Sequence, residues 1–153
     1  FKDTNCIIRF LEFMDVGNVN SWNLTDVISL KDILNAISEK YHIKPLEKNY
    51  SSEVAKRWSY SGGEFGVISS ISNPFCGDCS RVRLTAEGKL FTCLFGDKPH
   101  NIKDMLRSSD SDDTIRDNFV KIWENRDDKY SENRVNNGEY KVIKKAEMSY
   151  IGG

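Results

Sequence analysis

Three of the four cysteines lie within a short window of the sequence and could bind a metal. Cys76 and Cys79 form a C-x2-C pair, which lets two thiolates bind one metal ion or cluster from a single turn. Cys93 supplies a third thiolate if the chain turns back after the pair. Three ligands leave a tetrahedral site one short. Either a fourth ligand comes from elsewhere in the chain, or the last position is kept for something that is not protein.

Two arginines follow the C-x2-C pair. Arg81 and Arg83 are two residues apart on a predicted strand, so their guanidinium groups point to the same face, next to the metal. Paired arginines beside a thiolate-bound metal suit a phosphate-bearing or otherwise anionic substrate. Alone, the two residues would indicate an ordinary solvated strand. Beside an incompletely ligated metal, they favour an open iron that a substrate heteroatom can occupy.

The cysteine pattern has two other interpretations. A structural zinc site would take its fourth ligand from His100, His42 or Cys6, although zinc ribbons usually carry a second C-x2-C pair, which this sequence lacks. An iron-sulfur electron carrier would also need a fourth protein ligand, and its arginines would dock an acidic partner. Cys6 stands alone in an apolar segment, where we expect a small buried hydrophobic residue.

The surrounding elements must bring the cysteines together. A hairpin is predicted from strands at 81–84 and 90–94 with a turn at Glu87–Gly88, and it folds Cys93 back toward the C-x2-C pair. The other predicted elements are a buried strand at 6–14 with its polar groups at one face, a Gly/Asn-rich loop at 15–23, a helix after the Ser29–Asp32 capping box, a hairpin across 55–72, a short helix around 102–106 and a longer helix from Ser111.

The composition is that of an ordinary globular domain. With 153 residues, 39% of them apolar and 29% charged, the chain can bury one sizeable core. A net charge of −1 gives no global field of the kind that marks a nucleic-acid or anionic-membrane binder, so any anion site is local. No apolar run approaches the roughly 20 residues that span a bilayer. The polar segment 125–142 is predicted to be mobile.

Two features concern the context of the chain. It begins at Phe1 without an initiator Met or a leader pattern, so we expect it to be a piece of a longer protein. The clustered cysteines favour metal ligation in a reducing compartment over disulfides. A cytoplasmic protein is therefore expected.

Several segments resemble one protein family closely. They are FLEFMDVGNVNSW at 10–22, SSISNPFCGDCSRVRLTAEGKLFTCLF at 69–95, DDKYSENR at 127–134 and EMSYIGG at 147–153. These segments are similar to the C-terminal part of the molybdenum cofactor biosynthesis protein A family, the radical SAM GTP 3′,8-cyclases. The resemblance runs from about Arg9 to Gly153. It has two departures, Ser80 in place of Asn and Glu87 in place of Asp, and neither falls on a ligand.

The resemblance implies a fold and an activity. The fold is α+β, with the last strand or strands of a partial (β/α) TIM-type barrel followed by a C-terminal extension of antiparallel hairpins and helices that carries an iron-sulfur cluster. Residues 1–45 would end the barrel, and 46–153 would bind cluster and substrate, with a mobile tail at 125–153. The family consists of lyases that convert GTP to (8S)-3′,8-cyclo-7,8-dihydroguanosine 5′-triphosphate in molybdenum cofactor biosynthesis.

The resemblance also implies the cofactor ligands. Cys76, Cys79 and Cys93 would hold a [4Fe-4S] cluster with one iron left free to bind the purine of GTP. Met14 would border S-adenosylmethionine, and Arg9 would face the same cavity.

The substrate site follows from the same resemblance. Arg81, Val82 and Arg83 would line the GTP site, where the arginines hold phosphate or stabilise the radical intermediate. Gly152 and Gly153 would reach into the active site.

One motif of the family is missing from this sequence. The family's chemistry starts at an N-terminal [4Fe-4S] cluster held by C-x3-C-x2-C, which cleaves S-adenosylmethionine to a 5′-deoxyadenosyl radical. The implied partner is therefore an N-terminal radical SAM portion, and the chain alone is expected to be inactive. An exposed barrel-strand edge would favour a homodimer. The alternative function is a structural zinc-binding or iron-sulfur interaction module without catalysis.

Overall fold

The computed structural model describes residues 1–137 and 145–151 and has an α+β fold, as predicted. The chain divides into two compact units. The first unit holds Phe1–Asp15, Trp22–Cys79 and the described part of Ser131–Gly138. The second unit holds Val16–Ser21, Ser80–Tyr130 and the described part of Glu139–Gly153. The described strands form one open sheet in each unit and no closed barrel.

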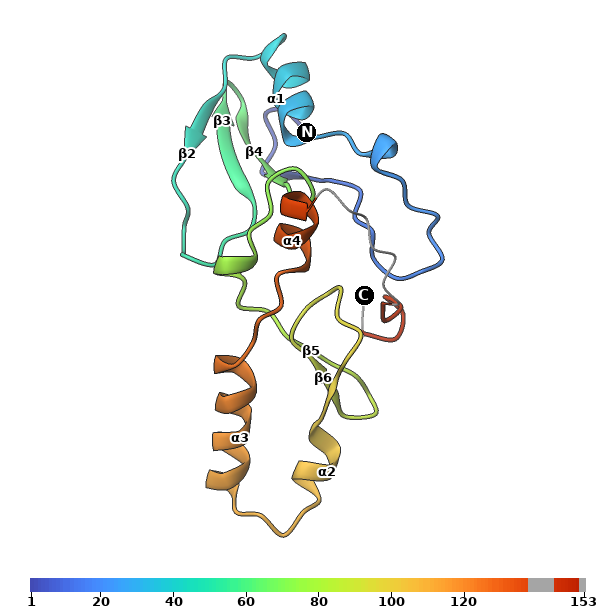
Figure 1. Ribbon diagram of the computed structural model, residues 1–153. Coiled ribbons are helices and arrows are strands. Elements are labelled where there is room, and N and C mark those ends of the chain that lie inside the picture. The colour runs from blue at the N-terminus through green and yellow to red at the C-terminus, as the bar shows by residue number, and fades with distance from the viewer. Residues whose placement is uncertain (138–144, 152–153) are drawn as a thin grey trace. The chain divides into compact units, whose positions relative to one another are not determined.

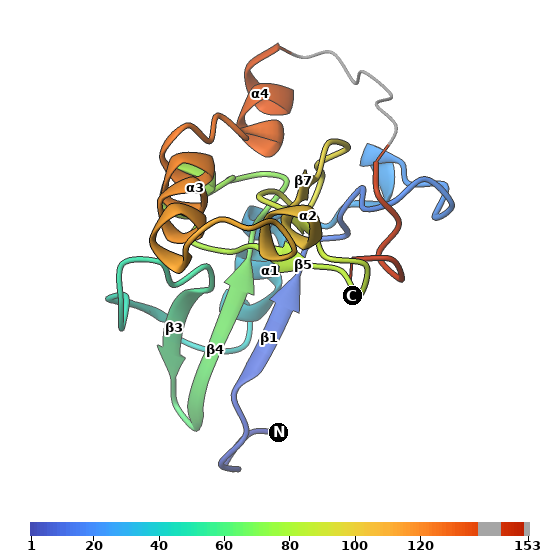
Figure 2. The same cartoon turned by 90° about the horizontal axis from the view of Figure 1, so that it is seen from below.

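The first unit is built on a four-stranded sheet in the order β1-β4-β3-β2. Its strands are β1 (Ile8–Leu11), β2 (Lys44–Leu46), β3 (Lys56–Tyr60) and β4 (Gly63–Ile68). β4 pairs with β1 in parallel and with β3 antiparallel, as Figure 2 shows, and β2 pairs antiparallel with β3. The boundary expected at residue 45 falls inside β2 of this sheet.

The β3–β4 hairpin confirms the strand pair predicted across 55–72. Tyr60 is paired with Gly63, so Ser61 and Gly62 form the turn. Gly62 has a φ of 123°, which L side chains rarely adopt, and a Cβ there would meet the Lys2 side chain. The turn therefore requires glycine at this position.

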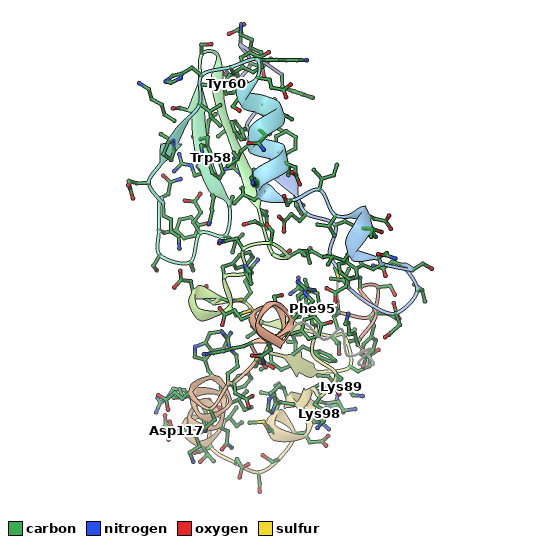
Figure 3. The ribbon with its side chains drawn as sticks, turned by 45° about the horizontal axis from the view of Figure 1, so that its top comes forward. Trp58, Tyr60, Lys89, Phe95, Lys98 and Asp117 are labelled. Carbon is green, nitrogen blue, oxygen red and sulfur yellow. The ribbon has the colours of Figure 1, made fainter. Side chains whose placement is uncertain are left out.

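Helix α1 (Leu30–Ser38) lies beside this sheet (Figure 1). It begins at the predicted capping box, in which Ser29 Oγ accepts from the Asp32 N–H and the Asp32 carboxylate accepts from the Ser29 N–H. The apolar side of α1 packs against the buried core of Trp58, Phe65 and Val67. Trp58, labelled on β3 in Figure 3, stacks on Phe65 with 5.6 Å between ring centroids. The capping box and the hydrophobic spacing together explain this layer.

β1 is shorter and more exposed than the buried strand predicted at 6–14. It lies at the edge of the sheet, where Arg9, Phe10 and Leu11 are exposed. Glu12 is buried just beyond the strand, so its environment differs from that of Arg9, and the two do not form one polar face. Cys6 precedes the strand and is exposed, which corrects the expectation of a buried residue.

The second unit has a smaller sheet in the order β5-β6-β7. β5 (Arg83–Leu84) and β6 (Lys89–Phe91) form the predicted hairpin, and β7 (His100–Asn101) pairs with β6. The predicted helices α2 (Ile102–Leu106) and α3 (Asp112–Glu124) are both present, and Ser111 caps α3. Among the described residues of this unit, the buried apolar side chains are Leu90, Phe91, Phe95, Ile102 and Ile151.

A helix that the sequence did not predict, α4 (Tyr130–Asn137), lies in the polar segment 125–142. Its Ser131 and Arg134 side chains are buried, which the polar composition did not suggest. Residues 138–142 of that segment lie outside the described residues. Two short 3-10 helices, η1 (Leu24–Asp26) and η2 (Cys76–Asp78), complete the described elements. Among 1–137 and 145–151, no helix has both the length and the apolar character to span a membrane.

Candidate metal centre

The C-x2-C pair forms a short turn in the first unit. Within η2 and its cap, the Cys79 N–H donates to the Cys76 carbonyl at 3.2 Å. The turn sets the two half-buried cysteines at its ends. All four cysteines lie in the described residues and are thiols, with no disulfide between them. The turn therefore offers two thiolate donors from one short segment, as zinc and iron-sulfur sites require.

Side chains from two other segments hold this turn. Lys48 Nζ lies 2.8 Å from the Asp78 carboxylate. The Gly77 N–H donates to Glu132 Oε1 at 3.1 Å. Lys48 comes from the loop after β2, and Glu132 comes from α4. Sequence reasoning gave neither residue a role, and the only signal was the place of Glu132 in the DDKYSENR segment.

Cys93 follows β6 in the second unit and is half-buried. The β5–β6 register sets Arg83 opposite Phe91, so the hairpin returns the chain toward its own start. The Gly96 N–H donates to the Cys93 carbonyl at 3.2 Å and closes a turn there. Within either unit, the described His, Cys, Asp and Glu side chains form no group of three that could hold a metal ion. The meeting of Cys93 with the C-x2-C pair stays a prediction.

The arginine pair lies only partly on a strand. β5 begins at Arg83, so Arg81 and Val82 precede the strand instead of alternating along it. The shared strand face that the spacing predicts is therefore not formed, because only two residues of β5 find partners in β6. Arg83 is half-buried, whereas Arg81 and Val82 are exposed.

A pocket of about 550 Å³ lies beside Cys93 in the second unit. Its charged lining residues are Asp97, Lys98, Lys121, Arg126, Asp127 and Asp128. Lys98 is labelled in Figure 3. The Arg126 guanidinium stacks over the Trp123 ring, with 4.3 Å between its Cζ and the ring centroid. Asp128 accepts a hydrogen bond from the Thr92 hydroxyl. Since cations and carboxylates are equally represented, the pocket is polar without being a dedicated anion site.

Arg9 belongs to a charged network on the sheet of the first unit. Its Nη1 lies 3.7 Å from Glu64, and its side chain crosses Gly66, where a Cβ would come within 3.0 Å of Arg9 Cδ. Arg57 donates to both oxygens of Glu64, at 2.7 and 2.8 Å. These hydrogen bonds hold the pKa of Glu64 below its ordinary value and raise the pKa of Arg57. Arg9 therefore neighbours a carboxylate that stays ionised at neutral pH.

The segment after β1 is fixed by a buried carboxylate. Glu12 is only 2% exposed and accepts hydrogen bonds from the N–H groups of Leu30, Ile71 and Ser72, each at 2.8 Å. It thereby ties the end of β1 to the start of α1 and to the loop after β4. Met14 follows two residues later and is half-buried. Its expected contact with S-adenosylmethionine stays a prediction.

A buried ion pair joins α4 to the same part of the first unit. The Arg134 guanidinium donates to the Asp15 carboxylate and, at 3.3 Å, to the Ser70 carbonyl. The Arg134 and Asp15 side chains are 4% and 6% exposed. The ring of Trp22 lies 5.7 Å from the Arg134 guanidinium. α4 is therefore anchored although its sequence is mostly polar.

The C-terminal segment is bound within the second unit by the loop after β1. The Asn18 side chain donates to the Lys145 carbonyl at 2.7 Å and accepts from its N–H at 3.0 Å. Glu147 accepts from the N–H and the side chain of Asn18, at 2.9 and 2.7 Å. Gly17 has a φ of 66°, and a Cβ there would meet the Glu147 carboxylate. Gly152 and Gly153 lie outside the described residues.

Comparisons with known proteins agree with the resemblance read from the sequence. The family model described as Molybdenum Cofactor Synthesis C matches residues 6–132. The chain is 42% identical over its whole length to a GTP 3′,8-cyclase from Staphylococcus carnosus, of which it covers 46%. It is 41% identical, over 99% of its length, to a GTP 3′,8-cyclase from Acidothermus cellulolyticus, of which it covers 49%. The chain belongs to the Molybdenum Cofactor Synthesis C family, and it spans about half the length of these curated relatives.

Proposed function

We propose that this chain is the C-terminal part of a GTP 3′,8-cyclase and that it binds a [4Fe-4S] cluster and GTP. The observation that carries the proposal is its similarity, along its full length, to relatives of that name. The chain alone contains no C-x3-C-x2-C motif. A second [4Fe-4S] cluster, S-adenosylmethionine and the radical chemistry therefore belong to an N-terminal portion, without which we expect no cyclisation of GTP.

The cluster would be held by Cys76, Cys79 and Cys93. The donor chemistry fits, because all three are half-buried thiols and two of them stand at the ends of one turn. When bound, such a cluster supplies an iron that has no protein ligand and can accept a purine nitrogen. The pocket beside Cys93 would give the proposed site a polar lining next to that cysteine.

The residues around the cluster would bind and orient GTP. Arg81 and Arg83 would offer guanidinium groups to the triphosphate, with Val82 between them against the substrate. Arg9 would add a third cation beside Met14, which would border S-adenosylmethionine. We expect these side chains to hold the ribose and the base of GTP in one orientation, because cyclisation joins two atoms of the same substrate.

The sheet of the first unit supports a partial barrel in the longer protein. α1 packs on the face of the sheet that carries Trp58 and Phe65. Arg9 lies over Gly66, on the opposite face. A barrel interior would use the face opposite its helices. Among the described strands β1 pairs only with β4, so its other edge is where the preceding strand of the N-terminal portion would pair. Without that portion, a second copy could pair there and form a homodimer.

The experiment is anaerobic reconstitution of the chain with iron and sulfide, followed by metal analysis and visible absorption. We expect a broad band near roughly 400 nm that Cys76→Ala, Cys79→Ala and Cys93→Ala each abolish. Cys6→Ala is the matched control and should leave the band unchanged, because Cys6 is not one of the three proposed ligands.

The alternative is a structural zinc-binding or iron-sulfur interaction module without catalysis. Taken by itself, the C-x2-C turn favours this alternative, because such a turn suits zinc as well as it suits an iron-sulfur cluster. A colourless protein with stoichiometric zinc, and no change on addition of GTP, would establish the zinc-binding form of that alternative and refute the cyclase role for this chain.

A further inference from the structure

We propose that α4 is a clamp for the C-x2-C turn and that Glu132 is the positioning residue through which it holds the turn. The inference deepens the proposed function and rests on it, because it gives Glu132 a role at the ligands of the cluster. It concerns only residues of the first unit.

The first observation is the contact itself. Gly77 lies between the two cysteines, and its N–H donates to Glu132 Oε1 at 3.1 Å. Hydrogen bonds from a backbone N–H to a carboxylate are stronger than those between neutral groups. The contact joins positions 55 residues apart in the sequence, so it is not a local feature of the turn.

The second observation is that α4 is fixed in place two residues further along. Arg134 binds the Asp15 carboxylate and the Ser70 carbonyl, and both side chains of the ion pair are buried. Separating the members of a buried pair is costly, so α4 has little freedom to move at Arg134. Arg134 therefore determines where Glu132 can reach.

The third observation is a second contact to the turn, made by a side chain of the opposite charge. Lys48 pairs with Asp78 at 2.8 Å, and both side chains are about half exposed or more, at 47% and 63%. An exposed pair of this kind adds little stability. It nevertheless means that the turn is contacted both by an anion from α4 and by a cation from the loop after β2.

The contact has a chemical consequence for a bound cluster. The Glu132 carboxylate adds negative charge next to the ligand turn and engages an N–H that could otherwise donate to a sulfur. Extra negative charge and fewer hydrogen bonds to sulfur both lower the reduction potential of an iron-sulfur cluster. Groups that orient metal ligands also affect metal affinity, typically by about 10- to 100-fold when they are removed.

The experiment compares the wild-type chain with Glu132→Gln and Glu132→Ala after reconstitution with iron and sulfide. For Glu132→Gln, which keeps the shape and removes the charge, we expect wild-type iron content and a more positive reduction potential. For Glu132→Ala, we expect a further positive shift and iron release to a chelator about 10- to 100-fold faster. Glu39→Gln removes the same charge from the exposed end of α1 and should change neither quantity.

Two results separate this inference from the proposed function. If the wild-type chain holds a cluster and both Glu132 variants match it in potential and iron release, the clamp is refuted and the proposed function stands. If the wild-type chain takes up no cluster, the proposed function fails, and the clamp is tested with Co²⁺ alone. A loss of Co²⁺ affinity in Glu132→Ala of about 10-fold or more then supports the clamp, and equal affinity refutes it.

Discussion

The two units of the chain are stabilised in different ways. The first has a four-stranded sheet whose central strands, β3 and β4, carry an aromatic core of Trp58 and Phe65 covered by α1. The second has strands of only two or three residues, and one of its most buried side chains, Ile151, comes from the C-terminal segment. The first unit has a sheet-and-helix layer with its own aromatic core, whereas the second has short strands and a core to which the C-terminal segment contributes.

This difference bears on the metal site that we propose. The first unit supplies the C-x2-C turn on a scaffold with its own hydrophobic core. The second carries Cys93 just after a small hairpin, whose strands have only two and three residues. A cluster held by all three cysteines would therefore stabilise the second unit more than the first, since binding free energy adds to folding free energy.

The largest effect expected in the first unit comes from its buried ion pair. Arg134→Ala leaves Asp15 buried without its counter-charge, and we expect a loss of about 3–5 kcal/mol in the free energy of unfolding, measured by urea denaturation. The double variant Arg134→Met, Asp15→Leu should recover most of this loss, because well-packed apolar groups can replace a buried pair. A loss below about 1 kcal/mol in Arg134→Ala would show that α4 is not anchored by this pair.

The second unit should respond most to a change at its C-terminal segment. Ile151 is 2% exposed, so Ile151→Ala removes buried apolar contacts and is expected to cost about 2–5 kcal/mol. Val19→Ala is the matched control in the same unit, because Val19 is 84% exposed and should change stability by less than about 0.5 kcal/mol. Equal effects of the two substitutions would show that the segment 145–151 is not part of the core.

The smallest effect is a pH dependence at Glu64 in the first unit. Arg57 lowers the pKa of Glu64 from 4.5, so the pair stabilises the fold fully above pH 4.5 and loses this contribution as the pH falls through the lowered value. Glu64→Gln should therefore be less stable than wild type at about pH 7, and this difference should shrink as the pH falls below 4.5 and through the lowered pKa of Glu64. A stability difference that does not shrink on acidification would contradict the assignment. Thermal unfolding at several pH values measures it.

Local patterns in the sequence predicted the elements that local interactions determine. The Ser29–Asp32 box sets the start of α1, and Gly62 sets the turn between β3 and β4. The capping residues and the glycine act within a few positions of themselves, so their effect can be read without tertiary structure.

Long-range interactions account for what the sequence did not predict. α4 is polar, and its Arg134 is buried only because Asp15, 119 residues away, neutralises it. The contact between Glu132 and Gly77 is hidden for the same reason. Arg81 and Arg83 alternate in the sequence, but β5 pairs over only two residues, so the pattern overestimated the strand. For Arg81 and Arg83, the spacing beside the cysteines indicated an anionic substrate, and the family resemblance implied that this substrate is GTP.

The most direct test of the central claim is the EPR spectrum of the reconstituted, reduced chain with and without GTP. If Cys76, Cys79 and Cys93 hold a cluster with one iron open to substrate, GTP should change the signal of the wild-type chain, and Arg83→Ala should require more GTP for the same change. A cluster that is present and reduced, but whose spectrum is the same with saturating GTP, would contradict the claim that this chain presents an open iron to the substrate.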